Sequence, residues 1–128
     1  MKPTSRKTAR RQALYLLYQW DLTGQELATL YEGEPDDFAR ALAEAVAERA
    51  EALDVRVSAA SPDWPAERLG TLERNILRIG VYELEEETVP REVAINEAVV
   101  LAKRYATEDA ARLVNGILGR IAREQEVA

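Results

Sequence analysis

The sequence of 128 residues contains neither cysteine nor histidine. These absences exclude thiol nucleophiles, Ser–His and Cys–His catalytic pairs, disulfides and the usual ligands of structural zinc. We therefore expect no enzymatic activity, no metal site and no cofactor. The chain also lacks any run of about 18 uncharged apolar residues, so the sequence predicts a soluble cytoplasmic protein that makes no use of a membrane.

Charge is distributed unevenly along the chain, whose net charge is −6. The first eleven residues hold five cations and no acid, so the remaining residues carry a net charge of −11. Ten acidic residues and only two arginines lie between Asp21 and Asp54. A basic segment on an acidic body indicates a polyanion that is bound at one place and repelled elsewhere.

Apolar residues recur at helical spacing almost throughout, so we predict an all-α fold and a single domain of residues 1–128. Thr23-Gly24, the segment 61–65 and Pro90 predict helix ends. The expected helices span about 5–22, 34 to the break at 61–65, 69–87, 91–106 and 107–123.

Three glycines, Gly80, Gly116 and Gly119, fall inside these expected helices. Each costs about 1 kcal/mol relative to alanine there. We therefore expect another backbone to pass close to them; the alternative is that the helices simply tolerate them.

The first expected helix carries cations beside its apolar face. At 100° per residue, an arc next to that face collects the residues that we call the basic stripe: Arg6, Lys7, Arg10, Arg11 and Tyr18. Phosphates bind such cations and bases stack on tyrosine, so the stripe suits single-stranded RNA. Cations at the start of a helix oppose its dipole, so helix stability does not explain them. The alternatives are a solvated basic end, or one that pairs with acidic helices of the same fold.

The segment 91–106 offers a second candidate surface. Asn96 and Lys103 lie one heptad apart, outside the expected apolar face, and are candidate RNA contacts. Asn96 could instead cap a neighbouring helix. The acidic clusters at 36–37 and 85–87 point in different directions on their helices and are therefore expected to be solvated surface rather than catalytic groups.

Four motifs together resemble the NusB family of transcription antitermination proteins. They are K-T-A-R-R-Q-A-L-Y-L-L-Y-Q-W-D at 7–21, L-R-I-G-V-Y-E-L at 77–84, V-P-R-E-V-A-I-N-E-A-V-V-L-A-K at 89–103 and V-N-G-I-L at 114–118. Their order and spacing match over nearly the whole chain, and only the stretch 24–63 lacks a signature. The last two motifs, with eleven residues from Lys103 to Val114, are the specific part of the match.

The resemblance implies a fold of two packed, perpendicular three-helix bundles. It also implies a protein without catalysis that binds the boxA element of nascent ribosomal RNA transcripts, together with the small-subunit ribosomal protein NusE. The pair would then join the antitermination complex of RNA polymerase. Relatives of this fold also form the front part of RNA cytosine methyltransferases, and a stand-alone relative of that domain is an alternative.

By position, the resemblance assigns functional roles to several residues. The family's RNA-binding arm falls on Lys2, Arg6, Lys7, Arg10 and Arg11, and its following tyrosine on Tyr18. Further RNA contacts fall on Asp109 and Leu113, where the family usually has an aromatic residue in place of this leucine. The surface that faces NusE would include Glu73. Two alternatives remain from the residues themselves, a DNA-binding helical regulator and a helical protein–protein interaction module.

Overall fold

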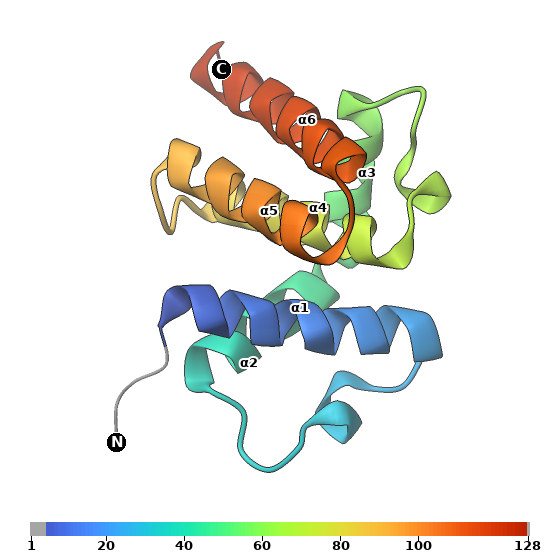
Figure 1. Ribbon diagram of the computed structural model, residues 1–128, viewed down its shortest axis with the longest axis vertical. Coiled ribbons are helices and arrows are strands. Elements are labelled where there is room, and N and C mark those ends of the chain that lie inside the picture. Colours follow the sequence, from blue (N-terminus) through green and yellow to red (C-terminus); the bar gives the residue numbers. More distant parts are fainter. Residues whose placement is uncertain (1–4, 128) are drawn as a thin grey trace.

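The computed structural model describes residues 5–127, and within this range it contains helices and no strand (Figure 1). The α-helices are α1 (Arg6–Thr23), α2 (Asp37–Glu48), α3 (Ala50–Ala60), α4 (Thr71–Glu86), α5 (Arg91–Tyr105) and α6 (Glu108–Val127). Two short 3-10 helices, η1 (Leu27–Leu30) and η2 (Ala66–Arg68), lie in the connections. The predicted all-α class is confirmed. Lys2 lies outside the described residues.

The helices pack in two groups, as expected. α4, α5 and α6 contact one another, and α1 packs on α2 and on α4. α3 follows α2 but packs mainly on α4 and α6, so it joins the two groups. The long helix α4 is central to both, which explains why so much of it is buried, from Asn75 to Val81.

Local capping explains where the helices begin and end. The Ser5 side chain accepts a hydrogen bond from the Thr8 N–H at the start of α1, and Gly24 ends α1 with a positive φ of 74°. The Thr107 hydroxyl accepts from the Ala110 N–H at 2.9 Å and caps α6. These boundaries agree with the sequence-based expectations to within a few residues.

The single helix expected from 34 to about 60 is two helices, so that expectation was wrong. Arg49, with φ −102° and ψ 10°, separates α2 from α3. No proline or glycine marks this break. Its cause is tertiary, because α2 buries Leu42 and Val46 in the group with α1, whereas α3 buries Leu53 and Val57 against α4 and α6.

The helical glycines have different surroundings. A Cβ on Gly80 would lie 2.6 Å from Leu118 Cδ1, so α4 and α6 do approach closely there, through a side chain rather than a backbone. A Cβ on Gly116 would meet nothing within 4 Å, and one on Gly119 would meet only the end of the Arg123 side chain at 3.4 Å. The expected close backbone is therefore absent at both of these glycines.

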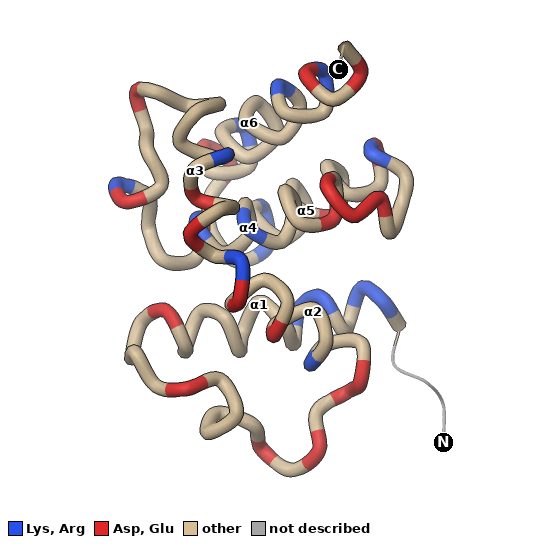
Figure 2. The backbone as a smooth tube through the Cα atoms, turned by 180° about the vertical axis from the view of Figure 1, so that it is seen from behind, with Lys and Arg blue, Asp and Glu red and all other residues tan. Residues whose placement is uncertain are grey.

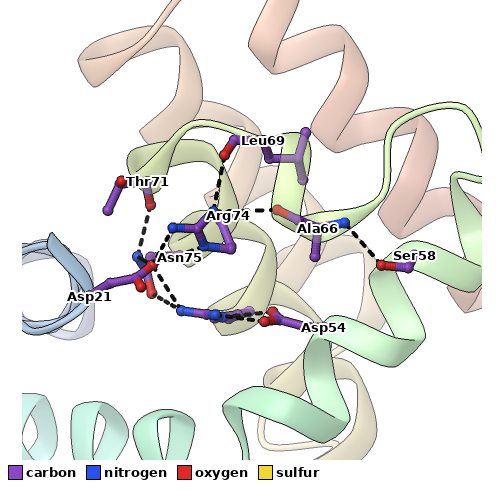
Figure 3. A network of polar contacts seen from close by, with 9 residues as sticks. Asp21, Asp54, Ser58, Ala66, Leu69, Thr71, Arg74 and Asn75 are labelled. Atoms are coloured by element: carbon purple, nitrogen blue, oxygen red, sulfur yellow. Dashed lines mark hydrogen bonds and ion pairs between the residues drawn. The ribbon is translucent and has the colours of Figure 1, made fainter. Parts of the chain in front are cut away.

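A polar network fixes the end of α1 against α4 and α3 (Figure 3). Asp21 Oδ2 accepts hydrogen bonds from Arg74 Nε at 2.9 Å, Asn75 Nδ2 at 3.0 Å and Arg78 Nη1 at 3.1 Å. Arg78 also donates to both oxygens of Asp54, at 2.7 and 2.6 Å. Burial lowers the pKa of Arg78, but the hydrogen bond and charge of Asp54, with the charge of Asp21, outweigh it and raise that pKa. This Asp21 network joins the C-terminal part of α1 to α4 and, through Arg78, to α3.

Candidate nucleic-acid interface

Three cations of the basic stripe reach the surface of α1. Arg6 and Lys7 are exposed near the start of the helix, where Figure 2 shows cations in blue. The Arg6 guanidinium lies 5.1 Å from the centroid of the Phe38 ring on α2, and Lys7 Nζ lies 3.8 Å from Glu97 Oε1 on α5. Arg11 is partly buried and donates to the Thr8 hydroxyl at 3.2 Å. These contacts are weak, so the phosphate groups of a bound nucleic acid can replace them.

Arg10 does not belong to this surface, so its assignment to an exposed RNA-binding stripe was wrong. Its side chain is 4% exposed and forms a two-pronged ion pair with Glu83 on α4, whose side chain is 2% exposed. Arg10 Nε and Nη2 each lie 2.9 Å from a Glu83 oxygen. Position 10 is buried because it lies on the same side of α1 as the buried Leu14, which follows it by four residues.

Aromatic residues continue the surface along α1. Tyr18, Tyr15 and Arg11 line a hollow of about 410 Å³ together with Leu72 of α4 and Tyr105 at the end of α5. Tyr15 and Tyr105 are exposed. We call Arg11, Tyr15, Tyr18 and Tyr105 the tyrosine groove. Stacking faces beside a guanidinium are what an unpaired base requires.

Sequence reasoning missed two members of this groove. Tyr15 could have been found, because it follows Arg11 by four residues and lies outside the apolar face of α1. Tyr105 could not, because it reaches the groove only through the packing of both α1 and α5 on α4.

A second hollow of about 450 Å³ adjoins the groove on the side of the 30–36 segment. It shares Arg11, Tyr15 and Tyr105 but is also lined by Tyr31 and by carboxylates such as Glu32. The Tyr31 hydroxyl donates to Glu44 Oε1 at 2.8 Å. Burial, together with this hydrogen bond and the Glu44 charge, raises the pKa of Tyr31 to about 12. The acids make this side of the surface unfavourable for phosphate.

Lys103 and Asn96 lie elsewhere on the molecule. Lys103 lines a separate hollow of about 240 Å³ with Arg112 and Asn115 of α6. Asn96 is exposed and precedes Lys103 by seven residues on the same side of α5. Within residues 5–127 Asn96 caps no helix, so the capping alternative has no support.

Glu73, Asp109 and Leu113 come together at the N-terminal ends of α4 and α6. They line a hollow of about 610 Å³ with the exposed Trp64 and with Arg68; we call it the Trp64 hollow. Asp109 also forms an ion pair with Arg112. Sequence reasoning missed Trp64, whose position between Pro62 and Pro65 was interpreted only as a helix break.

The described residues provide little for other kinds of site. Among residues 5–127, no group of acidic side chains is placed to hold a metal ion, and no helix is long and apolar enough to cross a membrane. Glu85 and Glu86 form ion pairs with Arg56 and Arg49 rather than converging on a common point.

The fold and these surfaces define an all-helical protein whose exposed cations and tyrosines suit single-stranded nucleic acid. The family model of NusB matches residues 7–123. The chain therefore belongs to the NusB family, and the resemblance found in its motifs is confirmed.

Individual relatives match over nearly their full length. The transcription antitermination protein NusB of Rubrobacter xylanophilus is 42% identical over 121 residues, which are 89% of this chain and 87% of that protein. The solved structure of T. maritima NusB has a TM-score of 0.85 at 33% identity and covers 96% of this chain and 94% of its own. A crystal structure of the antitermination factors NusB and NusE in complex with dsRNA contains a chain with a TM-score of 0.80 at 30% identity, covering 93% and 96%.

Proposed function

We propose that this protein is a transcription antitermination factor that binds boxA-type single-stranded RNA of nascent ribosomal RNA transcripts together with NusE. In this role it joins the antitermination complex of RNA polymerase in the cytoplasm, and residues 1–128 act as one RNA-binding domain. The observation that carries the proposal is the line of exposed cations on α1 that leads into the tyrosine groove. The names of the relatives and the NusB–NusE–dsRNA structure support it.

The proposed RNA contact is electrostatic along α1 and aromatic at the groove. Arg6, Lys7 and Arg11 neutralise phosphates, while Tyr15 and Tyr18 offer faces on which bases stack. Three phosphate contacts on a single strand give a slope of about −2 for log K against log salt. The function is one of binding and assembly, and no step in it requires a catalytic group.

We place the NusE contact at the Trp64 hollow. Glu73 is the candidate NusE contact there, and the exposed Trp64 supplies apolar area. Asp109 and Leu113 stay candidate RNA contacts and line the same hollow with Arg68 and Arg112. A basic ribosomal protein is attracted by the acidic body of this chain, while RNA away from α1 is repelled. Lys103 and Asn96 remain candidate contacts for RNA that extends beyond the groove.

Titration of labelled boxA RNA, with and without NusE, tests the proposal. Replacement of Arg6, Lys7 and Arg11 by alanine is expected to weaken RNA binding at least about tenfold and to flatten its salt dependence. The matched control replaces Arg56, Arg120 and Arg123, which removes the same charge from α3 and from the C-terminal half of α6. Equal loss in both variants, or no loss in either, would refute the RNA surface; tighter binding of duplex DNA would favour the DNA-binding alternative.

A further inference from the structure

Three hollows of the structure each contain a candidate RNA contact. Tyr18 lines the tyrosine groove, and Asp109 lines the Trp64 hollow. Lys103 lines the smaller hollow between α5 and α6, which we call the Lys103 hollow. One RNA strand can contact all three residues only if these hollows adjoin one another.

The tyrosine groove and the Trp64 hollow meet at two places. On α4, Leu72 lines the groove and the next residue, Glu73, lines the hollow. Where α5 leads into α6, Tyr105 lines the groove and Thr107 lines the hollow. Neighbouring Cα atoms are about 3.8 Å apart, so a strand that leaves the groove at either place enters the hollow directly.

Arg112 on α6 joins the Trp64 hollow to the Lys103 hollow, because its side chain lines both. This side chain is 70% exposed, and it pairs with Glu108 at 4.0 Å and with Asp109, whose side chains are 83% and 89% exposed. Ion pairs between such exposed groups are weak, so a phosphate can replace the carboxylates. Arg112 is therefore a cation at the point where a strand would pass from one hollow to the other.

Trp64 is the aromatic residue of the middle hollow, and it is 54% exposed. Leu113, which lines the same hollow, has no ring, whereas Arg68 and Arg112 supply two guanidinium groups. A ring beside cations repeats the composition of the tyrosine groove, where Arg11 lies among tyrosines. Such a surface suits a base and its phosphate. The two cations repel a basic protein, so charge favours RNA over NusE at this ring.

We propose that one RNA strand runs from the tyrosine groove through the Trp64 hollow to the Lys103 hollow, an inference that rests on the function proposed above. In the middle hollow one base stacks on Trp64, and Arg112 binds the phosphate with which the strand leaves. The strand is single there, because a paired base would not present its face to the indole. NusE keeps the Glu73 side of the hollow.

Fluorine NMR tests the stacking contact. The chain contains two tryptophans, and 5-fluorotryptophan at both positions gives signals from this protein alone, while NusE and RNA stay silent. Addition of boxA RNA with flanking nucleotides to the complex with NusE is expected to shift the Trp64 resonance, which Trp64→Phe identifies. The Trp20 resonance should stay in place, because Trp20 packs against the core with Arg78 over its ring. A strand with an abasic nucleotide at one position should still bind but lose the shift.

Affinity measurements with NusE present test both residues. Trp64→Leu is expected to weaken RNA binding about tenfold, and Trp64→Phe by less than about threefold, because the smaller ring still stacks. Arg112→Ala is expected to reduce the slope of log K against log salt by about 0.7. The matched control is Arg120→Ala, further along α6, which removes a similar exposed pair with Glu124 and should leave the slope unchanged.

Strands shortened stepwise from each end show that the contacts belong to one strand. From one end, the effects of Trp64→Leu and Arg112→Ala should disappear, while the effect of replacing Arg6, Lys7 and Arg11 persists. A Trp64 resonance that shifts with NusE and does not shift further with RNA would assign the ring to NusE and overturn the inference. Unchanged RNA binding in either Trp64→Leu or Arg112→Ala would overturn it as well. RNA binding that does not depend on Arg6, Lys7 and Arg11 would instead refute the proposed function itself.

Discussion

The buried ion pair of Arg10 and Glu83 allows a strong prediction about stability. Arg10→Met keeps an unbranched apolar stem but leaves the Glu83 carboxylate, 2% exposed, without its donors. Removing one partner of a buried pair costs about 3–5 kcal/mol, because the remaining charge stays desolvated. A protein of this size has a total stability of about 5–15 kcal/mol, so the loss is a large part of it.

Urea unfolding followed by circular dichroism measures this effect. Arg11→Met, one position along the same helix, removes only a partly exposed hydrogen bond to Thr8 and is expected to cost less than about 1 kcal/mol. The double variant Arg10→Met, Glu83→Leu removes both charges and should recover most of the loss. Similar costs for Arg10→Met and Arg11→Met would refute the reasoning, because they would show that position 10 is as solvated as position 11.

Three further predictions concern stability. Gly116→Ala should stabilise the protein by about 0.5–1 kcal/mol in urea unfolding, because an added Cβ has open space, whereas Gly80→Ala should destabilise it by about 1–3 kcal/mol. Because Leu118 is the side chain that the new Cβ meets, Gly80→Ala should cost less in a Leu118→Ala background than in the wild type. Asp21→Asn removes the negative charge from the acceptor that three donors share and should lower the unfolding free energy by about 2 kcal/mol; an unchanged denaturation midpoint would contradict the Asp21 network. The raised pKa of Tyr31 predicts a stabilising contribution that is complete below pH 10 and is lost as pH rises toward about 12; phenolate absorbance should show one late-titrating tyrosine that disappears in Tyr31→Phe.

The positions of the helices in the sequence could be predicted from local signals, but the elements that pack against each helix could not. Thr23-Gly24 predicted the end of α1, and the boundaries expected at residues 5 and 107 coincide with the caps at Ser5 and Thr107, because capping is decided by residues next to one another in sequence. The break at Arg49 left no local signal, since it arises where α2 and α3 turn toward different partners.

The candidate site, too, could be predicted from the sequence only in part. Arg6, Lys7, Arg11 and Tyr18 could be placed on one side of α1 by counting residues. Three of these side chains lie beside Tyr105 or Glu97 only because α1 and α5 both pack on α4. The acid that neutralises Arg10 lies 73 residues away in sequence, so no local pattern could show that this arginine is internal.

Arg10 also changes the electrostatic argument for RNA binding. Cations at the start of α1 oppose the helix dipole, and one of them is now explained by Glu83, which leaves Arg6, Lys7 and Arg11 to be explained by an external polyanion. If Arg10 stays paired when RNA binds, the double variant Arg10→Met, Glu83→Leu keeps the salt slope of the wild type. If Arg10 instead leaves Glu83 for a phosphate, that variant loses about 0.7 of the slope. We expect the first outcome. Freeing Arg10 would leave the buried Glu83 carboxylate without a partner, which costs about as much free energy as the Arg10→Met substitution. One phosphate contact contributes less than that.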